Sequence, residues 1–168
     1  MSTINNQPLS AHWNKVIKGL ILMIGLGSFH LVSADEKVNQ AKIPASPKYQ
    51  QECAACHIAY PAGMLPAASW ARLMNNLPNH FGTDASLDNA SVQQISQWLQ
   101  LYGGSYKRVT TEAPQDRITK SAWFIRKHDE VSAQTWKLAA VKSPSNCMAC
   151  HQQANLGDFN EHRIRIPR

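Results

Sequence analysis

All four cysteines of this 168-residue chain lie in two copies of one five-residue pattern, C-x-x-C-H. The copies are CAACH at residues 53–57 and CMACH at residues 147–151. Two thiols three positions apart on a helical turn can form thioethers with both vinyl groups of one porphyrin, and the next histidine can then bind the iron. The pattern therefore predicts two covalently attached haem c groups. The expected attachment residues are Cys53, Cys56, Cys147 and Cys150, and the expected proximal iron ligands are His57 and His151.

Other uses of paired cysteines fit this spacing less well. A structural zinc site with four cysteines typically has about 15–20 residues between its pairs, whereas Cys147 comes 90 positions after His57. A zinc site also gives no reason for a histidine after each pair. A thioredoxin-like C-x-x-C expects a strand–helix–strand context, which surrounds neither copy. Two disulfides would suit an exported chain, but they would not explain the repeated pentad.

The first 34 residues have the pattern of a secretory signal peptide. A polar start with two lysines and no acidic residue precedes an apolar run at residues 20–29, and Val-Ser-Ala at 32–34 offers a cleavage site. An uncleaved anchor is the alternative, but a spanning helix needs about 20 apolar residues and His30 interrupts the run. We therefore expect residues 1–34 to be cleaved, the protein to be periplasmic, and no stable membrane span to remain.

Charge and composition exclude some classes of protein. The net charge of +6 falls to +4 without residues 1–34, and haem propionates would largely offset the remainder. Some scattered arginines are therefore candidate propionate partners, and the others are solvated surface charges. No basic run exceeds a pair such as Lys107-Arg108, so nucleic acid is not an expected partner. A hydrophobic share of 43% excludes a disordered protein.

A sixth ligand for each iron must come from a small set of side chains. Without residues 1–34, and with Met148 confined to an attachment loop, the candidates are His80, His128, His162, Met64 and Met74. Met74 belongs to the apolar stripe of a predicted helix at 66–77, where a core role is the default. His80 lies in the turn beyond that helix.

His128 lies on an aromatic-flanked helix face, where a histidine is usually structural. Because a short chain must supply ligands for two haems, we instead expect His128 to be a ligand. His162 lies in a charged tail and is expected to face solvent. We therefore expect bis-histidine ligation. The expected pairs are His57 with His80 and His128 with His151, each 23 residues apart and in opposite chain order. A crossed pairing stays open.

Helices joined by loops are expected in the rest of the chain. Apolar residues at helical spacing predict helices over 66–77, 87–102, about 120–131 and 132–141, after a loose arm at 35–47. The expected caps are Asp88 or Asn89, Thr119 and Asn146, and Gly103-Gly104 ends the second helix.

No strand pattern of useful length is present, so the predicted class is all-α, with two small helical haem-binding halves and long loops. The haems would replace much of the core that 134 residues alone would struggle to build. The predicted domains are a signal peptide at 1–34, an N-terminal haem domain at 35–104 and a C-terminal haem domain at 105–168.

Beyond the pentads, the sequence resembles the periplasmic dihaem cytochrome c family, which includes partners of a small oxygen-binding monohaem cytochrome. In the N-terminal half the resemblance is carried by CAACHIAY at 53–60, LPAASW at 65–70, HFG at 80–82 and ASL at 85–87. In the C-terminal half it is carried by RIT at 117–119, WF and RKH within 123–128, residues 147–154 with Gly157, and IP at 166–167.

The resemblance implies bis-histidine, low-spin haems and one-electron transfer rather than substrate turnover, so the protein is not expected to be an enzyme. The family's distal histidines match His80 and His128, whereas His162 matches no family position. The implied partners are a soluble monohaem oxygen-binding cytochrome c and, as donor, a membrane b-type cytochrome or another quinol-linked protein.

Two other functions stay open. A small dihaem electron-transfer subunit of a periplasmic reductase, such as nitrate reductase, would also be bis-histidine, although the LPAASW and HFG stretches argue against it. A dihaem peroxidase or a haem sensor would need one haem with an open coordination site. Imidazoles on both faces of each iron would leave no such site and would favour a lower potential than His/Met ligation.

Overall fold

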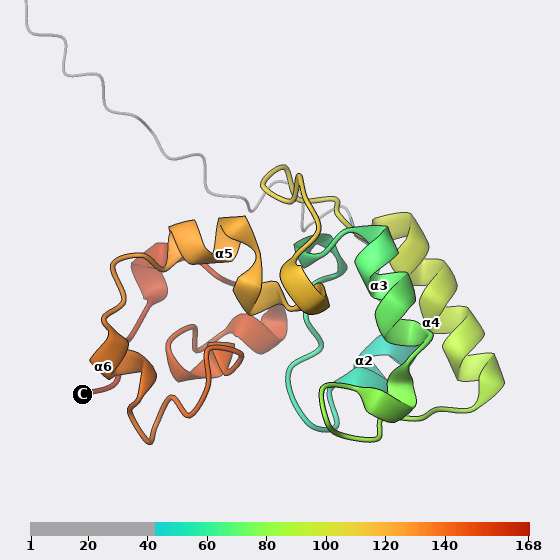
Figure 1. Cartoon of the computed structure of the whole chain (residues 1–168), viewed down its shortest axis with the longest axis horizontal. Helices are drawn as coiled ribbons and strands as arrows, with labels where there is room; N and C mark the ends of the chain where they lie inside the picture. Colours follow the sequence, from blue (N-terminus) through green and yellow to red (C-terminus); the bar gives the residue numbers. More distant parts are fainter. Residues whose placement is uncertain (1–42) are drawn as a thin grey trace, which may run out of the picture. The chain divides into compact units, whose positions relative to one another are not determined.

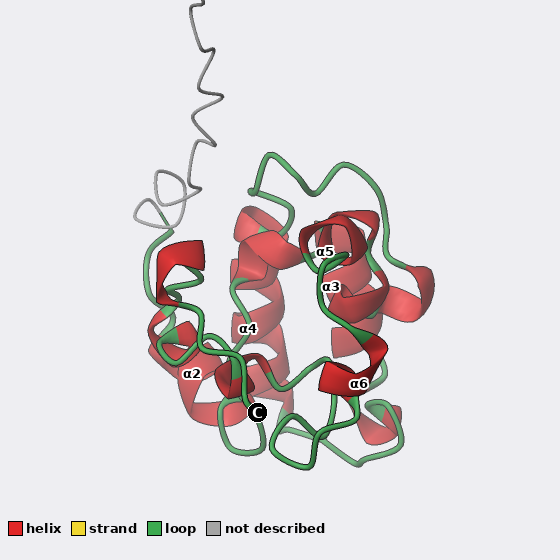
Figure 2. Cartoon of the chain, turned by 90° about the vertical axis from the view of Figure 1, so that its left-hand side faces the viewer, coloured by secondary structure: helices red, strands yellow, loops and turns green. Residues whose placement is uncertain are grey.

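The computed structural model describes residues 43–168, which belong to one compact unit. This part of the chain consists of short helices and loops and contains no β-strand (Figure 1, Figure 2). The predicted all-α class is confirmed. The α-helices are α2 (Pro47–Cys53), α3 (Ala67–Met74), α4 (Asn89–Tyr102), α5 (Ala122–Lys127) and α6 (Ala133–Trp136). The 3-10 turns are η1 (Ala62–Met64), η2 (Leu77–Asn79), η3 (Pro114–Asp116), η4 (Ile118–Lys120), η5 (Cys147–Ala149), η6 (Ala154–Leu156) and η7 (Glu161–Arg163).

The larger of two buried clusters lies where α3 and α4 pack side by side (Figure 1). Its members include Trp70 and Met74 from α3 and Ile95 and Leu99 from α4. They recur at helical spacing, so each helix presents one apolar stripe to the other. The predicted core role of Met74 is confirmed. α3 ends at Met74 rather than at Leu77, which begins a separate 3-10 turn.

α4 ends at Tyr102 as predicted, but it begins at Asn89, two residues later than expected. The Asp88 carboxylate accepts a hydrogen bond from the Ser91 amide at 3.0 Å, so Asp88 is the capping residue of the two expected candidates. At the other end the Gly103 amide donates to the Leu99 carbonyl at 2.8 Å. A Cβ on Gly103 would lie only 2.8 Å from the Ala67 Cα. Glycine at this position therefore permits the close approach of α3 and α4.

A second buried cluster joins early and late parts of the sequence. It consists of Met64, Tyr106, Trp123 and Phe124. The Trp123 indole donates a hydrogen bond to the Met64 carbonyl at 3.3 Å, which fixes α5 against the segment before α3. Met64 precedes the predicted domain boundary at residue 104, and the other three residues of this cluster follow it. The division into two haem domains at that point stays a prediction.

The C-terminal helices are shorter than predicted. The helix expected near 120–131 is only α5, and Ser121 rather than Thr119 caps it, because the Ser121 hydroxyl accepts from the Phe124 amide at 3.3 Å. Thr119 lies instead within a 3-10 turn. The helix expected over 132–141 is the four-residue α6. The prediction of longer helices here was wrong.

Two smaller expectations were also wrong. Asn146 occupies the N-cap position of η5, but its side-chain amide donates to the Val141 carbonyl at 3.1 Å and makes no capping bond. The second pentad begins in this 3-10 turn rather than in an α-helix. Pro47, expected in the loose arm, is the first residue of α2, which Ser46 caps. The predicted signal peptide and most of the arm lie outside the described residues. Within residues 43–168, no helix combines the length and the hydropathy that a membrane span requires.

Candidate haem-binding sites

The structure brings the imidazole rings of His57 and His80 close together. His57 follows the loop after α2, and His80 ends the turn after α3. Their ring centroids are 6.2 Å apart with an interplanar angle of 23°. Two imidazoles on opposite sides of one metal, with bonds close to the 2.0–2.1 Å typical of zinc, place their ring centres roughly 6 Å apart. This spacing therefore suits one iron between the two rings.

A second pair lies in the C-terminal part of the chain. His128 directly follows α5, and His151 forms an isolated antiparallel bridge with Ile164. The ring centroids of His128 and His151 are again 6.2 Å apart, with an interplanar angle of 75°. The histidines that are local in sequence are thus the ones that the structure places opposite each other.

One histidine of each pair is oriented by a backbone carbonyl. The Nδ1 atom of His57 lies 2.6 Å from the Ile58 carbonyl oxygen, and that of His128 lies 2.8 Å from the Phe124 carbonyl oxygen. A carbonyl only accepts, so Nδ1 carries the proton and Nε2 keeps the lone pair that a metal needs. The buried Nδ1 atoms of His80 and His151 have no hydrogen-bond partner.

The pKa values of these two histidines favour the metal-binding form. Burial, together with nearby His57 and Arg117, lowers the pKa of His80. Burial, together with His128, lowers the pKa of His151, against an opposing effect of Asp158. A lowered pKa keeps imidazole neutral, and only neutral imidazole binds a metal.

The four cysteines form no disulfide with one another, and Cys56 and Cys150 directly precede His57 and His151. Cys53 ends α2, and Cys147 begins η5. Burial, with a smaller effect of Glu52, raises the pKa of Cys53 to about 11, and burial raises that of Cys147 to about 11. A thioredoxin-like pair instead needs a lowered thiol pKa. Residues 43–168 contain no cluster of three or more His, Cys, Asp or Glu side chains that would hold a bare metal ion. A porphyrin supplies the remaining four ligands, so these residues fit a haem at each pair.

Aromatic side chains surround both pairs. At the first pair, Tyr60 stacks on His57 with ring centroids 4.8 Å apart, and Phe81 lies 4.9 Å from His80. The guanidinium carbon of Arg117 lies 4.2 Å from the centre of the Phe81 ring.

At the second pair, Phe124 stacks on His128 at 4.0 Å, and Trp136 lies 5.9 Å from the same ring. Phe159 lies 5.4 Å from His151. Sequence reasoning did not assign Tyr60 or Phe159 to a site, since neither belongs to a periodic stripe or to a ligand type.

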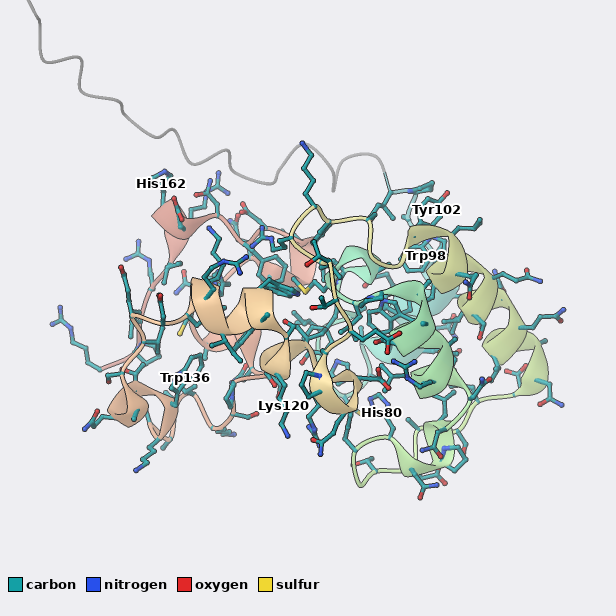
Figure 3. All side chains as sticks on the ribbon, turned by 45° about the horizontal axis from the view of Figure 1, so that its top comes forward. His80, Trp98, Tyr102, Lys120, Trp136 and His162 are labelled. Atoms are coloured by element: carbon teal, nitrogen blue, oxygen red, sulfur yellow. The ribbon has the colours of Figure 1, made fainter. Side chains whose placement is uncertain are left out.

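The remaining ligand candidates lie elsewhere. Met64 and Met74 are buried in the two apolar clusters. His162 is exposed in η7, and Figure 3 shows it at the outer edge of the C-terminal part, away from His80.

Comparisons with known proteins agree with this geometry. The model of the dihaem cytochrome c family matches residues 49–159. The chain is 40% identical to a diheme cytochrome c from Shewanella baltica OS155, with a TM-score of 0.65, covering 74% of this chain and 95% of that one. It is 47% identical to a diheme cytochrome c from Rhodobacter sphaeroides, with a TM-score of 0.62, covering 70% of this chain and 98% of that one. No curated protein sequence matches the chain significantly.

Proposed function

Because this chain belongs to the dihaem cytochrome c family, we propose that it is a periplasmic, bis-histidine, one-electron carrier between a quinol-linked membrane donor and a soluble haem protein. Family membership brings two covalent haem c groups and electron transfer as the activity. The proposal adds the ligand set, the location and the direction of electron flow.

We base the proposed iron ligands on the two histidine pairs of the structure. His57 with His80 would hold the first iron, and His128 with His151 the second. Cys53 and Cys56 would attach the first haem, and Cys147 and Cys150 the second. The observation that carries the proposal is the 6.2 Å separation within each histidine pair.

Two protein ligands on each iron decide between a carrier and an enzyme. An iron with imidazole on both faces is six-coordinate, so peroxide or oxygen finds no open position. Both oxidation states keep the same ligands, which limits the reorganisation that accompanies gain or loss of an electron. Replacing a methionine thioether by imidazole also lowers the potential. The protein is therefore proposed to relay electrons rather than to turn over a substrate.

The optical spectrum of the purified holoprotein tests the ligand set. We expect low-spin spectra in both oxidation states, no methionine–iron charge-transfer band, and no prompt binding of carbon monoxide by the reduced protein. His80→Ala and His128→Ala should each open one haem to carbon monoxide. His162→Ala is the matched control, because that exposed histidine lies outside both pairs. Prompt carbon monoxide binding by the unaltered protein would instead favour a peroxidase or a sensor.

The proposed partners need a separate test. The reduced holoprotein should pass electrons rapidly to a monohaem oxygen-binding cytochrome c in stopped-flow mixing. Cell fractionation should place the protein in the periplasm. Fast electron transfer only to the catalytic subunit of a reductase would instead support the role of an electron-transfer subunit of that reductase.

A further inference from the structure

Tyr60 connects the first histidine pair with the second attachment segment. It lies three positions after His57, and its ring stacks on the His57 ring with 4.8 Å between centroids and 26° between planes. Its hydroxyl donates a hydrogen bond of 2.7 Å to the Ser145 carbonyl, 85 residues further along the chain. The ring of Tyr60 thus contacts a proposed iron ligand, and its hydroxyl contacts the backbone two residues before the second pentad.

The Ser145 carbonyl continues this connection. It also accepts a hydrogen bond of 3.0 Å from the amide of Cys147, the first attachment residue of the second pentad. A continuous series therefore runs from the His57 ring through the Tyr60 ring and hydroxyl to the Ser145 carbonyl and the Cys147 amide. Each step is a stacked contact, a covalent bond or a hydrogen bond.

The surroundings of Tyr60 hold it in this position. It packs against both buried clusters, so it lies where the early and late parts of the chain meet. Its backbone carbonyl accepts a hydrogen bond of 2.5 Å from the hydroxyl of Tyr49, a buried residue of α2. Tyr60 is therefore held at its backbone carbonyl, at its ring and at its hydroxyl.

We propose that Tyr60 provides the route by which the two haem sites exchange electrons. Electronic coupling falls off more slowly across covalent and hydrogen bonds than across a gap, so this series favours transfer between the sites. In the exchange, the ferrous iron of one site is oxidised to ferric and the ferric iron of the other is reduced to ferrous. Tyr60 itself gains and loses no electron, and no proton moves. The inference rests on the proposed bis-histidine carrier.

Three variants of the holoprotein test the route. Tyr60→Phe keeps the stacked ring but removes the hydrogen bond to Ser145, and Tyr60→Leu removes both. Tyr102→Phe is the matched control, because it removes the hydroxyl of a tyrosine in α4 that takes no part in the series. The readout is the exchange rate between the two one-electron-reduced forms, measured by exchange NMR on the half-reduced protein. Optical spectra, both potentials and the Tm are measured alongside.

We expect exchange to be several-fold slower in Tyr60→Phe, slower still in Tyr60→Leu, and unchanged in Tyr102→Phe, with low-spin spectra in all three. If Tyr60→Leu fails to retain its haems, Tyr60→Phe alone decides. An unchanged rate in Tyr60→Phe, or equal slowing in Tyr102→Phe, would overturn the proposal and leave direct transfer between porphyrin edges. A failure of the carrier function itself would be distinguishable, because it would change the spectrum of the unaltered protein.

Discussion

Replacing Arg117 by glutamine should loosen His80 at the first site. Phe81, which follows His80, has a φ of 53°, a left-handed conformation that bulky residues rarely adopt. Such strain costs roughly 1–3 kcal/mol and persists only where the surroundings hold it. The guanidinium of Arg117 lies 4.2 Å from the Phe81 ring centre and is the contact that we expect to hold it. The buried Nδ1 of His80 has no hydrogen bond that would do so instead.

The size of the effect follows from the exposure of the pair. Phe81 is 42% exposed. A cation–π contact is worth about 0.5–1 kcal/mol when exposed and about 2 when desolvated, so we take about 1 kcal/mol here. Losing it should raise the population with His80 dissociated about fivefold. The rate of carbon monoxide binding to the reduced protein should rise by the same factor, because binding requires that open form.

Stopped-flow mixing of the reduced holoprotein with carbon monoxide measures this rate. Arg108→Gln is the matched control, since the guanidinium of Arg108 makes a similar contact with a different ring, 5.4 Å from the ring centre of Trp123. The reasoning is refuted if Arg117→Gln binds carbon monoxide no faster than the unaltered protein. It is equally refuted if Arg108→Gln shows the same acceleration, which would indicate general loosening.

Three further predictions concern stability. Leu99→Ala should cost about 2–5 kcal/mol of unfolding free energy in urea titrations, because Leu99 is only 1% exposed; a loss below 1 kcal/mol would contradict the assigned core. Gly103→Ala should cost about 1–3 kcal/mol in the same assay, because its Cβ would lie 2.8 Å from the Cα of Ala67 in α3; an unchanged stability would show that α3 and α4 can move apart at no cost. Asp88→Ala should lower the Tm at neutral pH, and the difference should vanish in acid. Hydrogen bonds from Ser91 lower the pKa of Asp88 below 3.8, so its stabilisation is present above that pH and is lost as the pH falls through the folded-state pKa. A Tm difference that persists at pH 2 would disprove this cause.

The sequence predicted α4 well because its signals are local and mutually consistent. An apolar stripe, an aspartate cap and a terminal glycine pair all indicate the same 14-residue helix. The C-terminal half carries no such agreement. Its helices have six and four residues, too few for periodicity to define their ends, and Thr119 and Ser121 are equally good caps by residue type.

Among the residues of the candidate sites, too, those with local sequence signals were predicted and those without them were not. The pentads are local patterns, and His80 and His128 were reached by elimination among few possible ligands. Tyr60 could not be found by either route. Its hydroxyl contacts a backbone carbonyl 85 residues away, and any residue type supplies a backbone carbonyl. Arg117 was one of many scattered cations until the fold placed it over Phe81.

The hydrogen bond between Trp123 and Met64 has a consequence for how the protein matures. In the proposed export to the periplasm, which would start at the N-terminus, the first pentad would emerge well before Trp123. The first haem would then be attached to a chain that still lacks the second buried cluster. A gene cut after residue 104, where the two predicted haem domains meet, would leave Met64 in one fragment and Tyr106, Trp123 and Phe124 in the other. The properties of the individual haems are therefore best resolved in the uncut polypeptide.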